Sequence, residues 1–272
     1  MKKHISFRSS ELLESLNLKE QKYFSIADAM IILSSSEPST VRRLLADMTK
    51  RGLILRVKDG LYNVIPYEKN SKEYIPNWHL TSAAIAQPYD YYLGFYTALD
   101  IHGLVTQPSL KEQIVTENQI IPKYRFVKEI KFEFINLQKK RFFGYEKTWI
   151  DDFNKVNCSD LEKTIIDCLY KPNAANGIIE ISKAIFISRE KINSDKILMY
   201  LEKFNTQVVY KRLGFILQHF KILLELSKEI RKRISNSYTL LDPSLPKSGK
   251  HYSEWKIVDN VGIESILNSV ET

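Results

Sequence analysis

Apolar residues recur at helical spacing near the start of the chain. They predict three short helices, at residues 11–18, 26–33 and 36–51. Ser25 stands where it can cap the second helix, and Asp28, three residues on, suits its positive N-terminus. The hydrophobic pattern therefore places three helices in the first fifty residues.

Two short apolar runs follow, at residues 53–57 and 61–65. Asp59-Gly60 lies between them, and an Asp-Gly pair between apolar runs is a strong signal for a β-hairpin. The order helix, helix, turn, helix, hairpin predicts a winged helix-turn-helix domain over about residues 8–65.

A polar stretch at residues 66–72 interrupts this pattern. We therefore expect a winged-helix domain at residues 1–68 and a larger mixed α/β domain at 69–272. Within the second domain the patterns predict strands at roughly 111–157 and helices at roughly 159–234, so that its last third is helical and the fold class is α+β. Two of the expected helices span residues 89–104, with a dense aromatic face, and 206–228.

The third predicted helix has one apolar face and one polar face. Val41, Leu44, Leu45 and Met48 fall at the spacing that faces a core, which turns Ser39 and Arg43 outward. Arginine recognises guanine through two hydrogen bonds, and serine or threonine reaches a base or a phosphate. We therefore expect double-stranded DNA contacts from six residues of this helix: Ser36, Ser39, Thr40, Arg42, Arg43 and Lys50.

The predicted hairpin adds two basic residues, Arg56 and Lys58, as phosphate or minor-groove contacts. Residues 34–58 hold six basic and two acidic side chains, a local surplus of four positive charges. This surplus favours DNA over the alternative, a winged helix used for protein–protein contact.

Overall charge points the same way but is less specific. The chain carries 40 lysines and arginines against 32 acidic residues, a net charge of +8, and such a surplus favours polyanionic partners. Cys158 and Cys168 lack metal-site spacing and are too few for a disulfide framework, so we expect them to be reduced core residues. With no apolar signal-peptide core and no apolar run of membrane-spanning length, a cytoplasmic protein without membrane association is expected.

Five segments, in order along the chain, resemble the AbiEi family, which comprises the antitoxin and repressor component of type IV toxin–antitoxin systems. The segments are KRGLILRVKDGLY at 50–62, YYLGFYTALDIHGL at 91–104, CSDLEKTIIDCL at 158–169, KRLGFIL at 211–217, and LLDPSLPKSGK at 240–250 with WKI at 255–257. The ordered set spans nearly the whole chain.

The resemblance implies a transcriptional autorepressor whose N-terminal domain binds inverted repeats in its own promoter. It further implies that the C-terminal domain opposes the growth arrest caused by a co-encoded nucleotidyltransferase toxin, without requiring direct contact with it. The alternatives are a winged-helix regulator that answers to another partner or ligand and, third, a metal-dependent nuclease.

Enzyme chemistry finds little support in the residues. No nucleotide-binding, serine-hydrolase or zinc-protease motif is present, so we expect no catalytic residue, metal or cofactor. A metal-dependent nuclease site needs acidic residues and a lysine on adjacent strands, and Glu117, Lys131 and Glu133 are the candidates. A solvent-facing strand edge explains Glu133 equally well. His102 fits a helix end bonded to the backbone.

Two charged clusters have ordinary explanations. The acidic cluster that begins at Asp160 reads as a helix cap followed by an i,i+4 pair of Lys163 with Asp167. Residues 189–250 hold thirteen basic and six acidic residues, which by default form a solvated helix face. A second nucleic-acid surface is the minority interpretation, and it would use the densest basic run: Lys228, Arg231, Lys232 and Arg233.

Overall fold

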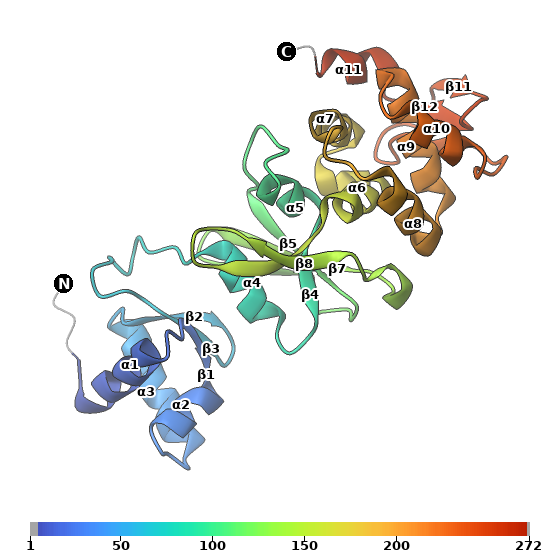
Figure 1. The fold of residues 1–272 in the computed structure, drawn as a ribbon. Coiled ribbons are helices and arrows are strands. Elements are labelled where there is room, and N and C mark those ends of the chain that lie inside the picture. Colours follow the sequence, from blue (N-terminus) through green and yellow to red (C-terminus); the bar gives the residue numbers. More distant parts are fainter. Residues whose placement is uncertain (1–4, 271–272) are drawn as a thin grey trace. The chain divides into compact units, whose positions relative to one another are not determined.

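The computed structural model describes residues 5–270, which divide into two compact units (Figure 1). The first unit runs to Pro88 and includes Arg125–Lys131, and the second comprises Tyr89–Tyr124 and the chain from Phe132 onward. Both units contain helices and strands, so the fold is of the mixed α+β class, as predicted.

The first unit contains three helices, a small sheet and a fourth helix. Its elements are α1 (Phe7–Leu18), β1 (Tyr23–Ser25), α2 (Ile26–Ile32), α3 (Pro38–Lys50), β2 (Ile54–Lys58), β3 (Leu61–Val64) and α4 (Trp78–Ala86). The predicted cap of α2 is present as a capping box, in which Ser25 accepts from the Asp28 backbone and Asp28 accepts from the Ser25 backbone.

The sheet of the first unit is antiparallel, with the strand order β1-β3-β2. Strands β2 and β3 form the expected hairpin around Asp59-Gly60, where Gly60 adopts a positive φ of 72°. Helices α1, α2 and α3 enclose a core that includes Leu12, Leu45 and Met48, each completely buried. The apolar pattern of these helices is therefore satisfied within the unit itself.

The chain stays with the first unit beyond residue 68, where the domain boundary was expected. The Tyr23 hydroxyl lies 2.7 Å from the Thr81 hydroxyl of α4, and Lys58 Nζ donates to the Ile85 carbonyl oxygen at 2.8 Å. Gly52 lies so close to Ser71 that a Cβ there would collide with it. These contacts place residues 69–88 in the first compact unit.

The second unit is built on a six-stranded sheet with the order β6-β7-β5-β4-β9-β8. Its early elements are β4 (Tyr91–Leu93), α5 (Phe95–Ile101), β5 (Lys111–Thr116), β6 (Tyr124–Val127), β7 (Ile130–Asn136), the 3-10 turn η1 (Lys139–Arg141), β8 (Tyr145–Trp149) and β9 (Lys155–Ser159). The segment Arg125–Lys131, which holds most of β6, the turn after it and the first two residues of β7, groups with the first unit.

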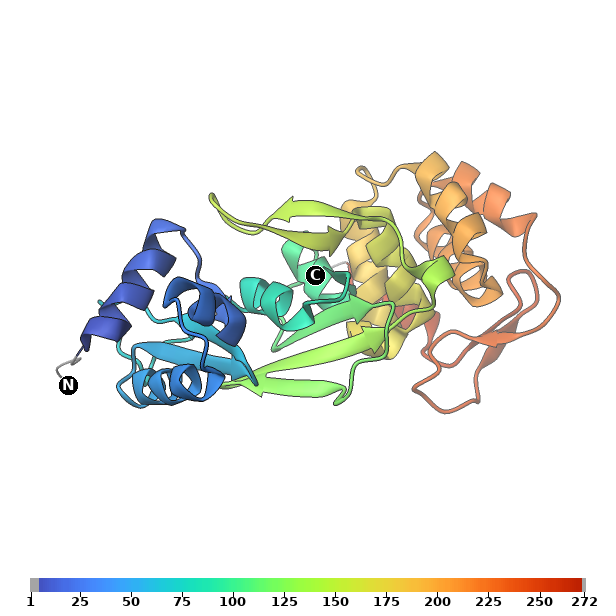
Figure 2. The same ribbon diagram turned by 90° about the horizontal axis from the view of Figure 1, so that it is seen from below.

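Helices and a small three-stranded sheet complete the second unit. They are α6 (Leu161–Tyr170), η2 (Pro172–Ala175), α7 (Ile178–Ser188), α8 (Ser194–Phe204), α9 (Gln207–Phe220), α10 (Leu224–Arg231), β10 (Thr239–Leu240), β11 (Lys250–Tyr252), β12 (Ile257–Asp259) and α11 (Ile263–Asn268). Helix α6 contacts α7, α8 and α9, and Figure 2 shows these helices, yellow to orange, gathered together.

Two stretches that were predicted to be single long helices are not single helices in the structure. Residues 89–104 form strand β4 and helix α5, because Tyr91 pairs with Thr116 and Leu93 with Cys158 inside the sheet. Residues 206–228 form most of two helices, α9 and α10, because the backbone between them turns through left-handed conformations at Lys221 and Leu223. Each break follows from contacts or backbone geometry that helical periodicity does not reveal.

Helix α9 carries two buried cations that fasten it to other parts of the second unit. The Lys211 ammonium donates to the Ser235 hydroxyl at 3.0 Å, and the Arg212 guanidinium donates to the carbonyl oxygens of Leu169 at 2.6 Å and Leu240 at 3.0 Å. One helical turn on, Gly214 lies directly against the buried indole ring of Trp255. The KRLGFIL segment thus holds the C-terminal part of the chain in place.

Replacing Gly214 with alanine is expected to lower the free energy of unfolding by about 1–3 kcal/mol, because the added Cβ overlaps the Trp255 ring. The gain of about 1 kcal/mol in helix propensity offsets only part of this cost. Urea denaturation of both proteins measures the change.

The matched test of this overlap repeats the substitution in a Trp255→Leu background, where the obstructing ring is gone. Gly214→Ala should then cost clearly less. Equal costs in the two backgrounds would show that the ring is not the obstacle.

Candidate nucleic-acid interface

Helix α3 presents two different faces. Val41, Leu45 and Met48 are buried, whereas Ser39, Thr40, Arg42, Arg43 and Lys50 are exposed. Ser36, two residues before the first turn, is also exposed, and Leu44, which was expected in the core, is only half-buried. The structure therefore brings the residues expected to contact DNA on this helix to its outer side.

Three cations on this outer side have no partner within residues 5–270. Arg42, Arg43 and Lys50 form neither a hydrogen bond nor an ion pair there. The nearby Arg51, by contrast, binds the Asp47 carboxylate at 2.7 Å, one helical turn back. The outer face of α3 thus offers unpaired positive charge, while its acidic residue is already neutralised.

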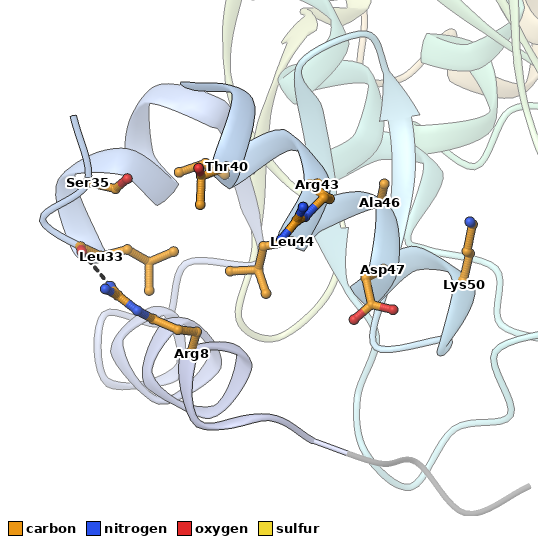
Figure 3. A pocket seen from close by; sticks show the side chains of 10 residues that line it. Arg8, Leu33, Ser35, Thr40, Arg43, Leu44, Ala46, Asp47 and Lys50 are labelled. Carbon is orange, nitrogen blue, oxygen red and sulfur yellow. Dashed lines mark hydrogen bonds between the residues drawn. The ribbon is translucent and has the colours of Figure 1, made fainter. Parts of the chain in front are cut away.

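A hollow of about 530 Å³ lies along this helix (Figure 3). Six of its ten lining residues are polar or charged: Arg8, Ser35, Thr40, Arg43, Asp47 and Lys50. Arg8 comes from α1 and the last four from α3, so the hollow is bordered by both helices. Arg8 was not among the predicted site residues, because nothing in the sequence pattern relates α1 to the outer side of α3.

The hairpin residues are held more closely than expected. Arg56 forms an ion pair with Asp59 across the turn. Lys58 is half-buried, and its ammonium donates to the carbonyl oxygens of Ile85 at 2.8 Å and Gln87 at 3.0 Å. Burial lowers the Lys58 pKa, and the charge of Arg125 lowers it further. Lys58 therefore differs from the exposed wing contact that was expected, because α4 and the residue that follows it, which the prediction lacked, supply its partners.

The basic run on and after α10 is paired with glutamates. Lys228 lies 2.7 Å from Glu225, and Arg231 lies 4.0 Å from Glu254. Lys232 pairs with Glu229, and Arg233 pairs with both Glu229 and Glu202. Each cation of the possible second nucleic-acid surface therefore has an acidic neighbour, unlike the unpaired cations of α3.

The i,i+4 pair of Lys163 with Asp167 is present on α6, and Asp160 caps the start of this helix. Neither Lys163 nor Asp167 is exposed at all. Tyr92 of β4 joins them, accepting from Lys163 Nζ at 2.8 Å and donating to Asp167 Oδ2 at 2.8 Å. Burial lowers the pKa of Lys163 and raises that of Asp167, while each partner's charge opposes the shift of the other. These charges form a closed internal network with no access to solvent.

The sequence suggested a solvent-facing strand edge for Glu133, but the structure does not place it at one. Its carboxylate is buried and binds Lys123 Nζ at 3.0 Å and Lys111 Nζ at 3.3 Å. Burial raises the Glu133 pKa, but hydrogen bonds from Lys123 and Gln113 and the two lysine charges outweigh it, so the pKa lies below its usual value. Between residues 5 and 270, no three histidine, cysteine or acidic side chains cluster as metal ligands would.

His102 and the two cysteines make contacts inside the protein. His102 Nε2 lies 2.8 Å from the Ser159 carbonyl oxygen, which matches the backbone-bonded helix end predicted for it. Cys158 and Cys168 are buried free thiols whose pKa values are raised by burial. In the part of the chain that the structure covers, every helix is too short or too polar to cross a membrane.

Comparison with known proteins gives a fold but no family. No family model matches the chain, and no curated protein sequence matches it. Among solved structures, the chain is similar to the crystal structure of the RV2827C protein from Mycobacterium tuberculosis, with a TM-score of 0.74 and 10% sequence identity. The similarity covers 100% of this chain and 97% of that chain, so the two proteins share a fold over essentially their whole lengths.

Proposed function

We propose that the first unit is a winged helix-turn-helix that binds double-stranded DNA, with α3 entering the major groove. The element order α1-β1-α2-α3-β2-β3 and the sheet order β1-β3-β2 support this assignment. In this arrangement α3 is the reading helix, and the β2–β3 hairpin is the wing that contacts the DNA backbone.

The unpaired cations of α3 carry the proposal. Arg42, Arg43 and Lys50 lie on the exposed side of an amphipathic helix and form no ion pair within residues 5–270. A protein-contact surface of this kind would be depleted in charge at its centre. A DNA interface instead needs unpaired cations, since phosphate contacts release counterions and supply most of the affinity.

For the whole chain, we propose a transcriptional autorepressor that also acts as the antitoxin of a type IV toxin–antitoxin system. This step rests on the ordered AbiEi-like segments. Four of them lie in the second unit, and its most buried residues include Lys163, Lys211 and Trp255 from those segments. The runner-up is a DNA-binding regulator with a different partner or ligand. A nuclease has less support, because the Glu133 carboxylate already forms ion pairs with two lysines.

Replacing Arg43 with alanine is expected to weaken sequence-specific binding by about 1–3 kcal/mol, because a guanidinium that recognises a base through two hydrogen bonds is lost. Fluorescence anisotropy with a duplex from the region preceding the gene, compared with a shuffled duplex of equal length, measures both affinity and specificity.

Arg43→Lys is the matched variant for this prediction. It keeps the positive charge but not the planar fork, so it should retain non-specific binding and lose preference for the cognate duplex. If Arg43→Ala binds both duplexes as the wild type does, Arg43 does not read DNA.

A further inference from the structure

Arg8 borders the hollow opposite α3 and stands outside every element expected to contact DNA. It lies in the first turn of α1, and its side chain is 60% exposed. Figure 3 shows it reaching from α1 toward the end of α2, with Arg43 and Lys50 on the other helix that lines the hollow. Three cations from two helices thus share one concave surface.

The Arg8 side chain is held by a defined contact. Its Nη1 donates to the Leu33 carbonyl oxygen at 2.9 Å, and Leu33 is the C-cap residue directly after α2. Carbonyl groups at a helix C-terminus lack intrahelical partners and carry partial negative charge, so they favour a guanidinium. A guanidinium has five N–H donors, and this bond uses one of them. Arg8 is therefore oriented while most of its donors remain available.

The charges around the hollow favour an anion. Its acidic residue, Asp47, is bound by Arg51, and Glu11 approaches Arg8 only to 3.8 Å at the exposed surface. Arg8, Arg43 and Lys50 therefore outnumber the available negative charge. The Ser35 and Thr40 hydroxyls add neutral donors suited to phosphate oxygens.

The position of the hollow identifies the kind of anion. If α3 lies in the major groove, a group beside α3 meets the phosphate backbone that borders that groove. We propose that Arg8 binds a phosphodiester group of the DNA backbone next to the groove that α3 enters. This inference rests on the proposed DNA-binding function and adds a contact from α1, which positions the domain without reading sequence.

The slope of log affinity against log salt concentration tests this contact. Full-length wild type and Arg8→Ala are titrated with a random-sequence duplex between about 50 and 200 mM salt. Removing one phosphate contact should flatten the slope by about 0.9 and weaken binding equally on cognate and random duplexes. Arg8→Lys, which keeps the charge, should retain most of the slope.

Lys19→Ala is the matched control, because it removes one positive charge from the opposite end of α1. A slope for Arg8→Ala equal to that of the wild type, or no flatter than that of Lys19→Ala, would overturn the inference. Arg8→Glu guards against a folding defect: if it melts at the wild-type temperature, it should flatten the slope at least as much. Failure of the wild type to bind any duplex would overturn the proposed function together with this contact, whereas wild-type binding with an unchanged Arg8→Ala slope overturns this contact alone.

Discussion

Replacing Lys163 with methionine is expected to lower the free energy of unfolding by about 3–5 kcal/mol at neutral pH, because the Asp167 carboxylate is left buried without its counter-charge. Tyr92 still donates to Asp167 Oδ2, but one neutral hydrogen bond does not replace an ammonium. Urea or thermal denaturation of the two full-length proteins measures the loss.

The pH dependence of the stability of Lys163→Met tests the buried pair more specifically. Burial already raises the Asp167 pKa, and removing Lys163 takes away the charge that opposes this shift. A carboxyl group whose pKa is raised in the folded state stabilises the fold while it is protonated, below its unfolded-state pKa. This stabilisation is lost as the pH rises through the folded-state pKa. The deficit of Lys163→Met should therefore shrink toward pH 4 and grow toward pH 8.

Two further variants serve as controls. Lys228→Met breaks the Lys228–Glu225 pair, in which the lysine is 67% exposed, and should change stability by no more than about 1 kcal/mol. Lys163→Met combined with Asp167→Leu removes both buried charges and should recover much of the loss. A loss for Lys163→Met as small as that for Lys228→Met would contradict the buried network.

Local signals in the sequence predicted three helices and the hairpin of the first unit. The capping box of α2 depends on two residues three positions apart, and the hairpin depends on Asp59-Gly60, so both are encoded within a few residues. The outward face of α3 followed from the spacing of its apolar residues. Strand β1 was missed, because its three residues are strand only by pairing with β3, where Tyr23 lies opposite Asn63.

The second unit depends more on distant partners. Residues 91–93 are a strand because β5 and β9 flank them, and neither neighbour is recognisable from the aromatic spacing that suggested a helix. The spacing of Lys163 and Asp167 predicted their pairing. Their burial was not predictable, because it depends on Tyr92, which lies on a strand some seventy positions earlier.

The candidate site shows the same division. Exposure of Arg42, Arg43 and Lys50 follows from helical geometry, so the sequence was sufficient to predict it. The burial and hydrogen bonding of Lys58 depend on carbonyl groups at the end of α4. The orientation of the Arg8 side chain depends on the Leu33 carbonyl group. Both contacts join elements that share no sequence pattern, and they became visible only in the folded chain.

Reversing two charges on α3 with Arg42→Glu and Arg43→Glu is expected to weaken DNA binding at least about a hundredfold. Two phosphate- or base-contacting cations are lost, and two carboxylates are brought against the phosphate backbone. Because both side chains are exposed and unpaired within residues 5–270, thermal stability should stay near that of the wild type. If antitoxin activity resides in the second unit, this variant should still rescue growth from a co-expressed nucleotidyltransferase toxin.

The most direct measurement compares duplex-DNA binding by the wild type, the α3 double variant and a double variant with Lys228→Glu and Lys232→Glu. The last carries the same change in net charge but places it on α10, where both lysines have glutamate partners. Fluorescence anisotropy at about 0.15 M salt should show binding by the wild type and the α10 variant, and near loss of binding by the α3 variant. Equal binding by the α3 variant and the wild type, or an equal loss in both double variants, would contradict a DNA interface on α3.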